Sequence, residues 1–105
     1  MKRRGPCYDP GEVAQLALAG RVVATQRVVS WLMNHDYDAA ETLVAVLSSL
    51  GPHGRWIGSV VLRNGEPADE YVVELLDEEW YVKFSVADGR VVIHVWSCCW
   101  DGSVH

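Results

Sequence analysis

The apolar residues of the chain follow two different periods, and the change between them divides the sequence near residue 55. In the first half, apolar positions recur every three or four residues, which is the spacing of a helix with one buried face. In the second half, apolar and polar residues alternate, as they do in a strand with one buried face. The pattern therefore predicts helices followed by strands.

Helix start signals occur three times in the first half. Each is a residue whose side chain can cap a helix N-terminus, and in two cases an acid follows three residues later, as in a capping box. Glycine, which often ends a helix, follows the first and third runs. The caps are Asp9, Thr25 and Asp38, the acids Glu12 and Glu41, and the glycines Gly20 and Gly51. We predict three helices, at about residues 10–19, 26–34 and 39–50.

Four runs rich in β-branched and aromatic residues follow, separated by short sequences with turn chemistry. They cover residues 56–63, 69–76, 80–86 and 90–96. Helices grouped before strands indicate an α+β domain. We expect residues 1–105 to form a single domain in which three N-terminal helices pack on a C-terminal antiparallel β-sheet of about four strands.

The last two runs predict a hairpin closed by a two-residue turn at Asp88 and Gly89. Counting outward from this turn pairs Phe84 with Ile93 on the buried face. On the other face it makes three direct cross-strand pairs, Ser85 with Val92, Lys83 with His94, and Tyr81 with Trp96.

Composition and charge limit the classes of protein. The chain has 105 residues, half of them apolar, which is typical of a globular domain. No apolar run reaches the roughly 18 residues that would span a membrane, and the charged start resembles no secretory signal, so we expect a cytoplasmic protein. The net charge of −5 repels phosphate at long range, and nucleic-acid binding would therefore need a local basic site.

The three cysteines, Cys7, Cys98 and Cys99, match no zinc-binding spacing and no disulfide framework. We expect thiols without metal, and no cofactor. The acids Asp77 to Glu79 fit the solvated tip of a hairpin better than a pair of catalytic carboxylates.

Two interpretations of the predicted polar sheet face remain open. In the first, the face is simply solvated, with the stem of Lys83 lying over aromatic rings. Alternatively, Tyr81, Lys83 and His94 form an anion or phosphate site, because lysine supplies fixed charge, histidine exchanges a proton near neutral pH and aromatic rings stack on bases.

Several short segments, in a fixed order over about residues 2–96, resemble the MqsR toxin family. The N-terminal matches are Lys2, Arg3, Pro6, Tyr8, Val13, Leu16, Gly20 and Thr25, and Leu50 matches the end of the third helix. The matching segments in the second half are Trp56–Ser59, Asp69–Tyr71 and Tyr81–Phe84. Of the family's residues implicated in cleavage, Tyr81 is retained, whereas a lysine is replaced by Gly58, a glutamine by Ala68, and a second lysine falls near Ser97.

The resemblance implies a RelE-like fold and the toxin of a bacterial type II toxin–antitoxin pair, a metal-independent endoribonuclease that cleaves mRNA and is neutralised by an antitoxin protein. We predict Tyr81, Lys83 and His94 as catalytic residues. Substrate binding is assigned to Arg55, Arg63, Tyr71 and Trp96. The alternative is a catalytically silent module of the same fold that binds a protein partner through its sheet.

Overall fold

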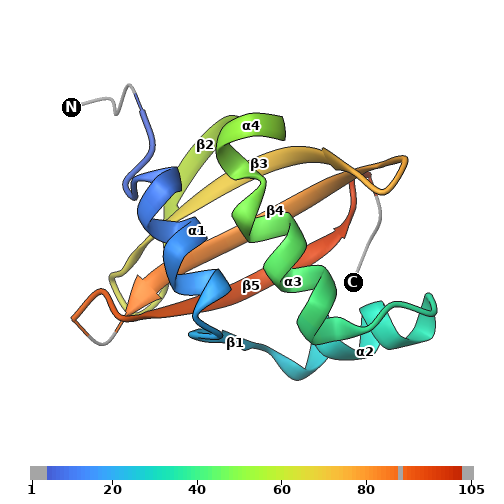
Figure 1. Cartoon of the computed structure of the whole chain (residues 1–105). Helices are drawn as coiled ribbons and strands as arrows, with labels where there is room; N and C mark the ends of the chain where they lie inside the picture. Colours follow the sequence, from blue (N-terminus) through green and yellow to red (C-terminus); the bar gives the residue numbers. More distant parts are fainter. Residues whose placement is uncertain (1–4, 88, 103–105) are drawn as a thin grey trace.

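The structure, a computed structural model, describes residues 5–87 and 89–102. Within them, four helices and a five-stranded mixed sheet form an α+β protein (Figure 1). The elements are α1 (Pro10–Leu18), β1 (Val22–Ala24), α2 (Gln26–Asn34), α3 (Ala39–Ser48), α4 (Leu50–His53), β2 (Gly54–Val61), β3 (Pro67–Leu75), β4 (Glu78–Ala87) and β5 (Val92–Trp100).

The three predicted helix starts are confirmed by their capping hydrogen bonds. The side chain of Asp9 accepts from the backbone N–H of Glu12, that of Thr25 from Val28, and that of Asp38 from Glu41. Each bond satisfies a donor that the first turn of a helix leaves unpaired.

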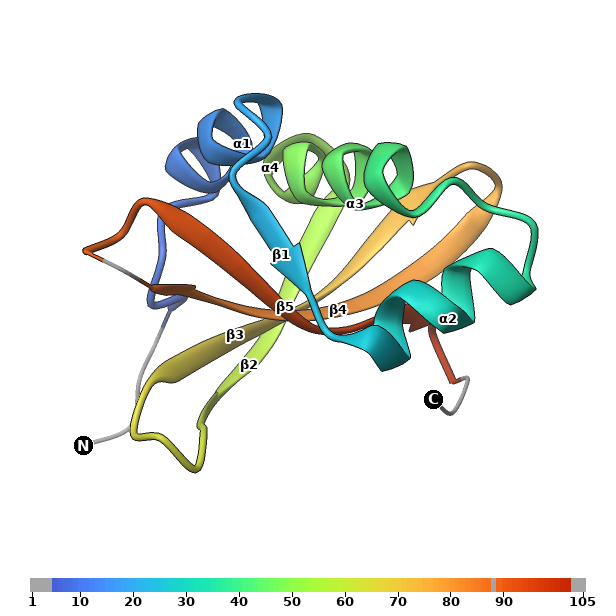
Figure 2. The same ribbon diagram turned by 90° about the horizontal axis from the view of Figure 1, so that it is seen from below.

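The sheet has the strand order β1-β5-β4-β3-β2, and all neighbours are antiparallel except β1 and β5. Helices α1, α3 and α4 lie on the same side of the sheet (Figure 2). Helix α2 packs beside β5, and the ring of its Trp31 meets those of Trp80 and Trp100 on that side. No helix among the described residues covers the opposite side. We call it the open face. Its polar residues include Arg55, Glu70, Glu74, Glu79, Tyr81, Lys83, Ser85, His94, Trp96 and Ser97, and Val72 and Cys99 lie on it as well.

The core lies between the helices and the covered face of the sheet. Alternate residues of the strands point into it, and Trp80, Val82 and Phe84 of β4 are fully buried. Leu32, Leu47 and other apolar residues of the helices pack against them. Removing this apolar surface from water is the main force that holds the helices to the sheet.

Asp69, whose side chain is fully buried, ties the segment before α1 to the sheet. Its carboxylate accepts the backbone N–H groups of Cys7 and Tyr8, each at 2.9 Å, and the hydroxyl of Ser59 at 2.6 Å. A buried carboxylate is tolerated only with such partners. The segment is therefore fixed over the ends of β2 and β3, where it leads into α1.

The four predicted strands are present as β2 to β5 and are antiparallel, but the prediction missed a fifth strand. Residues 22–24 form β1, which pairs in parallel with β5, Val22 lying opposite Ile93. The sequence contains no turn that would indicate this strand, because its parallel partner is 71 residues away. The sequence pattern therefore gives these three residues only as a link between two helices. The sheet is consequently mixed.

The predicted end of the third helix is also revised. Helix α3 stops at Ser48, and a separate turn, α4, follows over Leu50–His53. Gly51 lies inside this turn, and Pro52 is tolerated there because the first turn of a helix needs no N–H donors.

The predicted two-residue turn between the last strands is wrong. Ala87 pairs with Val92, not with Arg90, and the N–H groups of Arg90 and Val91 both donate to the carbonyl of Ala87. Asp88, half of that predicted turn, lies outside the described residues. The last strand, predicted to end at residue 96, continues as β5 to Trp100.

Among the described helices, none is both long enough and apolar enough to cross a membrane.

Replacing Phe84 by alanine is expected to lower the free energy of unfolding by about 3–5 kcal/mol, because a fully buried ring is lost and a cavity remains. Urea unfolding followed by tryptophan fluorescence measures this loss. Leu18→Ala is the matched control, since Leu18 is 70% exposed on α1 and alanine is an equally good helix former. Equal stability of the two variants would contradict the assignment of the core.

Candidate functional site

The candidate site lies on the open face and centres on Lys83, in the middle of β4. Tyr81 and Ser85 flank Lys83 on the same side of the strand, because alternate residues of a strand share a face. Glu70 of β3 lies directly opposite Lys83 on one side, and Ser97 of β5 on the other. The sheet thus collects polar groups from three strands around one lysine.

The predicted pairing of Lys83 with His94 is wrong, although both residues lie on the open face. His94 is opposite Ser85, and Lys83 is opposite Ser97. The predicted pairs of Ser85 with Val92, Phe84 with Ile93, and Tyr81 with Trp96 are wrong for the same reason. Lys83 and His94 are instead diagonal neighbours, whose Cα atoms lie about 7–8 Å apart in a regular sheet, within reach of long side chains.

The turn causes most of this change of register, because Ala87 pairs with Val92, two residues beyond its predicted partner, and a β-bulge at Trp96 adds one further residue. Phe84 pairs with Val95 and Lys83 pairs with Ser97, so Trp96 is the extra residue on β5. Its indole N–H donates to the hydroxyl oxygen of Ser85 at 2.9 Å, and its ring centroid lies 5.9 Å from that of His94. The bulge therefore directs the tryptophan onto the open face beside the histidine, as bulges near functional sites often do.

Ser85 is fully buried beneath this layer of side chains. Besides accepting from Trp96, its hydroxyl donates to a carboxylate oxygen of Glu66 at 3.4 Å. Glu66 also accepts from the side chain of Asn64, in the turn between β2 and β3. This chain of contacts holds Trp96 in place.

Tyr81 donates its hydroxyl proton in a short hydrogen bond to Oε2 of Glu70. Burial, and then this bond to a carboxylate, raise the pKa of the Tyr81 hydroxyl above its ordinary value. Tyr81 therefore remains protonated at neutral pH, and it acts as a hydrogen-bond donor and not as a base.

Lys83 keeps its charge available for a ligand. In the part of the chain that the structure describes, the one ion pair joins Arg90 to Glu12 at 3.8 Å, and both of those side chains are exposed. Glu70, the cross-strand neighbour of Lys83, is engaged by Tyr81. An ammonium group without a carboxylate partner can compensate a phosphate.

The two predicted arginines lie on either side of this group. Arg55 of β2 is opposite Val72, which is opposite Tyr81, so it occupies the row next to Lys83 on the open face. Arg63 is exposed in the turn between β2 and β3, at the end of the sheet where Glu66 contacts Ser85.

Tyr71 does not belong to the site. Its side chain is 3% exposed and lies on the covered face, where its ring stacks on Phe84 with centroids 6.1 Å apart. Residues of a strand alternate between faces, so Tyr71 points away from Glu70, its neighbour in the sequence. The prediction of a substrate-binding role for Tyr71 is therefore wrong.

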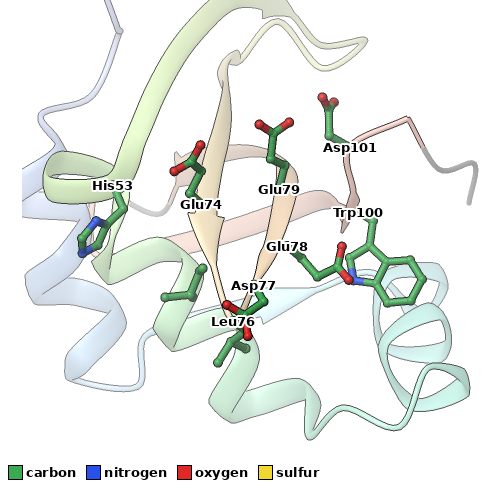
Figure 3. Close-up of a pocket in the computed structure, with 9 residues that line it drawn as sticks. His53, Glu74, Leu76, Asp77, Glu78, Glu79, Trp100 and Asp101 are labelled. Carbon is green, nitrogen blue, oxygen red and sulfur yellow. The ribbon is translucent and has the colours of Figure 1, made fainter.

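An acidic hollow of about 720 Å³ lies at the end of the sheet where β3 turns into β4. In Figure 3, Glu74, Glu79 and Asp101 point in the same direction from β3, β4 and the segment after β5. The exposed Asp77 and Glu78 border the same hollow, as expected for a hairpin tip. This end of the molecule repels phosphate, so a polyanion is favoured only around Lys83.

No group of three or more histidine, cysteine or acidic side chains is arranged to hold a metal ion within residues 5–87 and 89–102. Cys98 and Cys99 are both buried, and as successive residues of β5 they point to opposite faces. Burial raises the pKa of the Cys98 thiol to about 12, so at neutral pH it remains a thiol.

Sequence reasoning missed Glu70 and Ser85 as members of the site. Glu70 was noticed only as part of the Asp69–Tyr71 segment, and Ser85 was placed opposite Val92. The alternation of strand residues between the two faces could have identified Glu70, because it places Glu70 on the face opposite to its buried neighbours Asp69 and Tyr71. The contacts of both residues depend on pairing between strands, which the sequence alone does not fix.

No protein-family model matches the chain, and no curated protein matches it. The functional argument therefore relies on the residues themselves and on their arrangement.

Tyr71→Phe is expected to reduce the loss of stability at alkaline pH. Burial, and then the charge of Asp69, raise the pKa of Tyr71 from 10.0 to about 12. The stability that this phenol contributes is present below pH 10 and is lost as the pH rises towards 12, because the unfolded chain loses the proton first.

Urea unfolding of both proteins at about pH 9 and about pH 11.5 measures the difference. The parent should lose more stability over this range than Tyr71→Phe. Equal losses would show that the phenol titrates as it does in the unfolded chain.

Proposed function

We propose that the protein is a cytoplasmic endoribonuclease of the MqsR toxin type, with a RelE-like arrangement of its sheet and helices, that cleaves mRNA without metal and is neutralised by an antitoxin protein. The observation that carries this proposal is the grouping of Lys83, His94, Trp96 and the Tyr81–Glu70 pair on one open sheet face. An open sheet face that combines polar groups with partly exposed aromatic rings suits single-stranded RNA, whose bases stack on such rings.

Cleavage by the neighbouring 2′-hydroxyl has three chemical requirements. A base must remove the hydroxyl proton, an acid must protonate the leaving 5′-oxygen, and positive charge must compensate the phosphate as negative charge develops on it. Lys83 supplies the charge, and His94 supplies a group that exchanges protons near neutral pH. Trp96, held beside His94, offers a stacking surface for a base.

The position of Lys83 also supports the comparison with MqsR toxins. Gly58, Glu70, Lys83 and Ser97 form one row across β2, β3, β4 and β5. Gly58 replaces one of the family's lysines, and the other falls near Ser97. Lys83 is thus the cation that this row retains, with Arg55 in the next row.

A second candidate function is supported by the free edge of the sheet. β2 pairs with β3 on one side only, and its Ile57, Val60 and Val61 are all exposed. An edge strand with apolar side chains favours the addition of a strand from another protein. The same fold without catalysis would then serve as a protein-binding module.

Lys83→Ala is expected to reduce RNA cleavage about tenfold to a hundredfold, because a charged hydrogen bond to phosphate contributes about 1.5–3 kcal/mol. The melting temperature should remain unchanged, since the side chain lies on the open face. Mapping of cleaved ends on total mRNA measures the effect. Arg27→Ala, which removes an exposed cation from α2, is the matched control and should cleave like the parent.

His94→Ala is expected to reduce cleavage about a hundredfold or more, and His94→Gln should fail as well because it keeps the size of the ring but not its proton exchange. His53→Gln, in exposed α4, controls for the loss of a histidine. If Lys83→Ala and His94→Ala both melt normally and cleave like the parent, the open face is not an active site and the protein-binding function is favoured.

Expression of the chain alone should arrest bacterial growth, and co-expression of a small protein encoded beside it should restore growth and co-purify with it. The expected partner carries basic groups, because the second half of the chain is acidic. Elution of the chain as a lone monomer after co-expression in mild salt would contradict the existence of an antitoxin.

A further inference from the structure

The geometry points to Glu70 as the general base of the cleavage reaction, held in place by Tyr81, with RNA as the substrate. This inference rests on the proposed function and extends it, since that function assigns a proton exchanger in His94 but leaves the second proton transfer without a residue.

The two carboxylate oxygens of Glu70 have different surroundings. Oε2 accepts the hydroxyl of Tyr81. Oε1 lies beside Gly58, at 3.8 Å from the point where a side chain at position 58 would place its Cβ. Oε2 is therefore held by Tyr81. Because glycine has no side chain, Oε1 faces space that a ribose hydroxyl can enter.

Glu70 is not neutralised by its cationic neighbour. Opposite charges directly across a sheet normally pair. Here Tyr81 takes the carboxylate instead, and among the described residues Lys83 forms no ion pair within 4.0 Å. A base and a phosphate-binding cation therefore stand side by side without cancelling each other.

The other carboxylates of the open face are less suited to this role. Glu66 accepts from Asn64 and from Ser85, whose hydroxyl lies under Trp96. Glu74 and Glu79 are opposite each other on β3 and β4 at the acidic end, where phosphate is repelled. Glu70 is the carboxylate whose row contains Lys83.

The positions of Glu70 and His94 fit a reaction that needs a base and an acid on opposite sides of a phosphate. They stand on β3 and β5, the two neighbours of β4, and strands two apart are separated by about 10 Å. Lys83 lies on β4 directly beside Glu70 and diagonally from His94, which is opposite Ser85. A phosphodiester above Lys83 would therefore have the carboxylate on one side and the imidazole on the other.

The cleavage step moves two protons and exchanges one P–O bond for another. Glu70 takes the proton of the 2′-hydroxyl, the 2′-oxygen forms a bond to phosphorus, and the bond from phosphorus to the 5′-oxygen breaks. The leaving 5′-oxygen takes a proton from His94 in its protonated form. The products are a 2′,3′-cyclic phosphate and a free 5′-hydroxyl, and no oxidant, metal or other reactant is consumed.

Glu70→Gln tests the base directly, because the amide oxygen still accepts from Tyr81 while the basic carboxylate is lost. We expect cleavage to fall a hundredfold or more, with the acid limb of the pH–rate profile flattened. Glu70→Asp keeps the carboxylate and should retain more activity. Glu74→Gln, on the same face of β3, is the matched control and should cleave like the parent with an unchanged profile.

Tyr81 is a positioning residue in this scheme. Tyr81→Phe should lower the rate, because the carboxylate of Glu70 is then no longer held in position. In the Glu70→Gln background, the same change should cause little further loss. Full additivity of the two losses would overturn this role.

The assay uses a short RNA that contains a site mapped with the parent protein, and a copy with a 2′-deoxy nucleotide at that site as the uncleavable control. If the parent cleaves, Lys83→Ala and His94→Ala fail, and Glu70→Gln remains within a few-fold of the parent, Glu70 is not the base and the proposed function stands. If the parent itself does not cleave any mRNA, the proposed function fails and the role of Glu70 fails with it. Thermal melting of each variant separates lost chemistry from lost folding.

Discussion

The one-sided burial of the sheet is the constraint on which the rest of the structure depends. Strand residues alternate between faces, so each strand must give its apolar residues to the helices and its remaining residues to the open face. Trp80, Val82 and Phe84 fill the core, and the residues between them, Tyr81 and Lys83, are thereby placed on the open face. The residues of the candidate site are thus positioned by the packing requirement of their neighbours.

Two local features modify this simple alternation. The bulge at Trp96 lets both Val95 and Cys98 enter the core, three residues apart, and it directs Trp96 over Ser85. On the covered side, buried Asp69 replaces an apolar contact with three hydrogen bonds, two of them to the segment before α1. Removing that carboxylate would leave backbone donors buried and unpaired, which is costly.

The sequence was informative where the signals are local. The caps Asp9, Thr25 and Asp38 identified the helix starts, and alternation placed Lys83 and His94 on the same face. It was uninformative in two places: β1 has a partner at the far end of the chain, and the longer turn after Ala87, together with the bulge at Trp96, shifted the cross-strand pairs. Tyr71 was wrongly assigned to the site because the resemblance of residues 69–71 to a family segment does not show which face of the strand each residue occupies.

The open face offers few cations for the proposed binding of RNA, and this limits how the proposed enzyme can work. Lys83, Arg55 and Arg63 would neutralise about three phosphates. A plot of the logarithm of the affinity for single-stranded RNA against the logarithm of the salt concentration should therefore have a slope of only about −2. Such weak electrostatic binding contributes little to holding the substrate in its ground state. Rate enhancement would then have to come from groups that act mainly in the transition state, namely the charge of Lys83 and the proton transfers. A site of this kind tolerates an acidic protein surface.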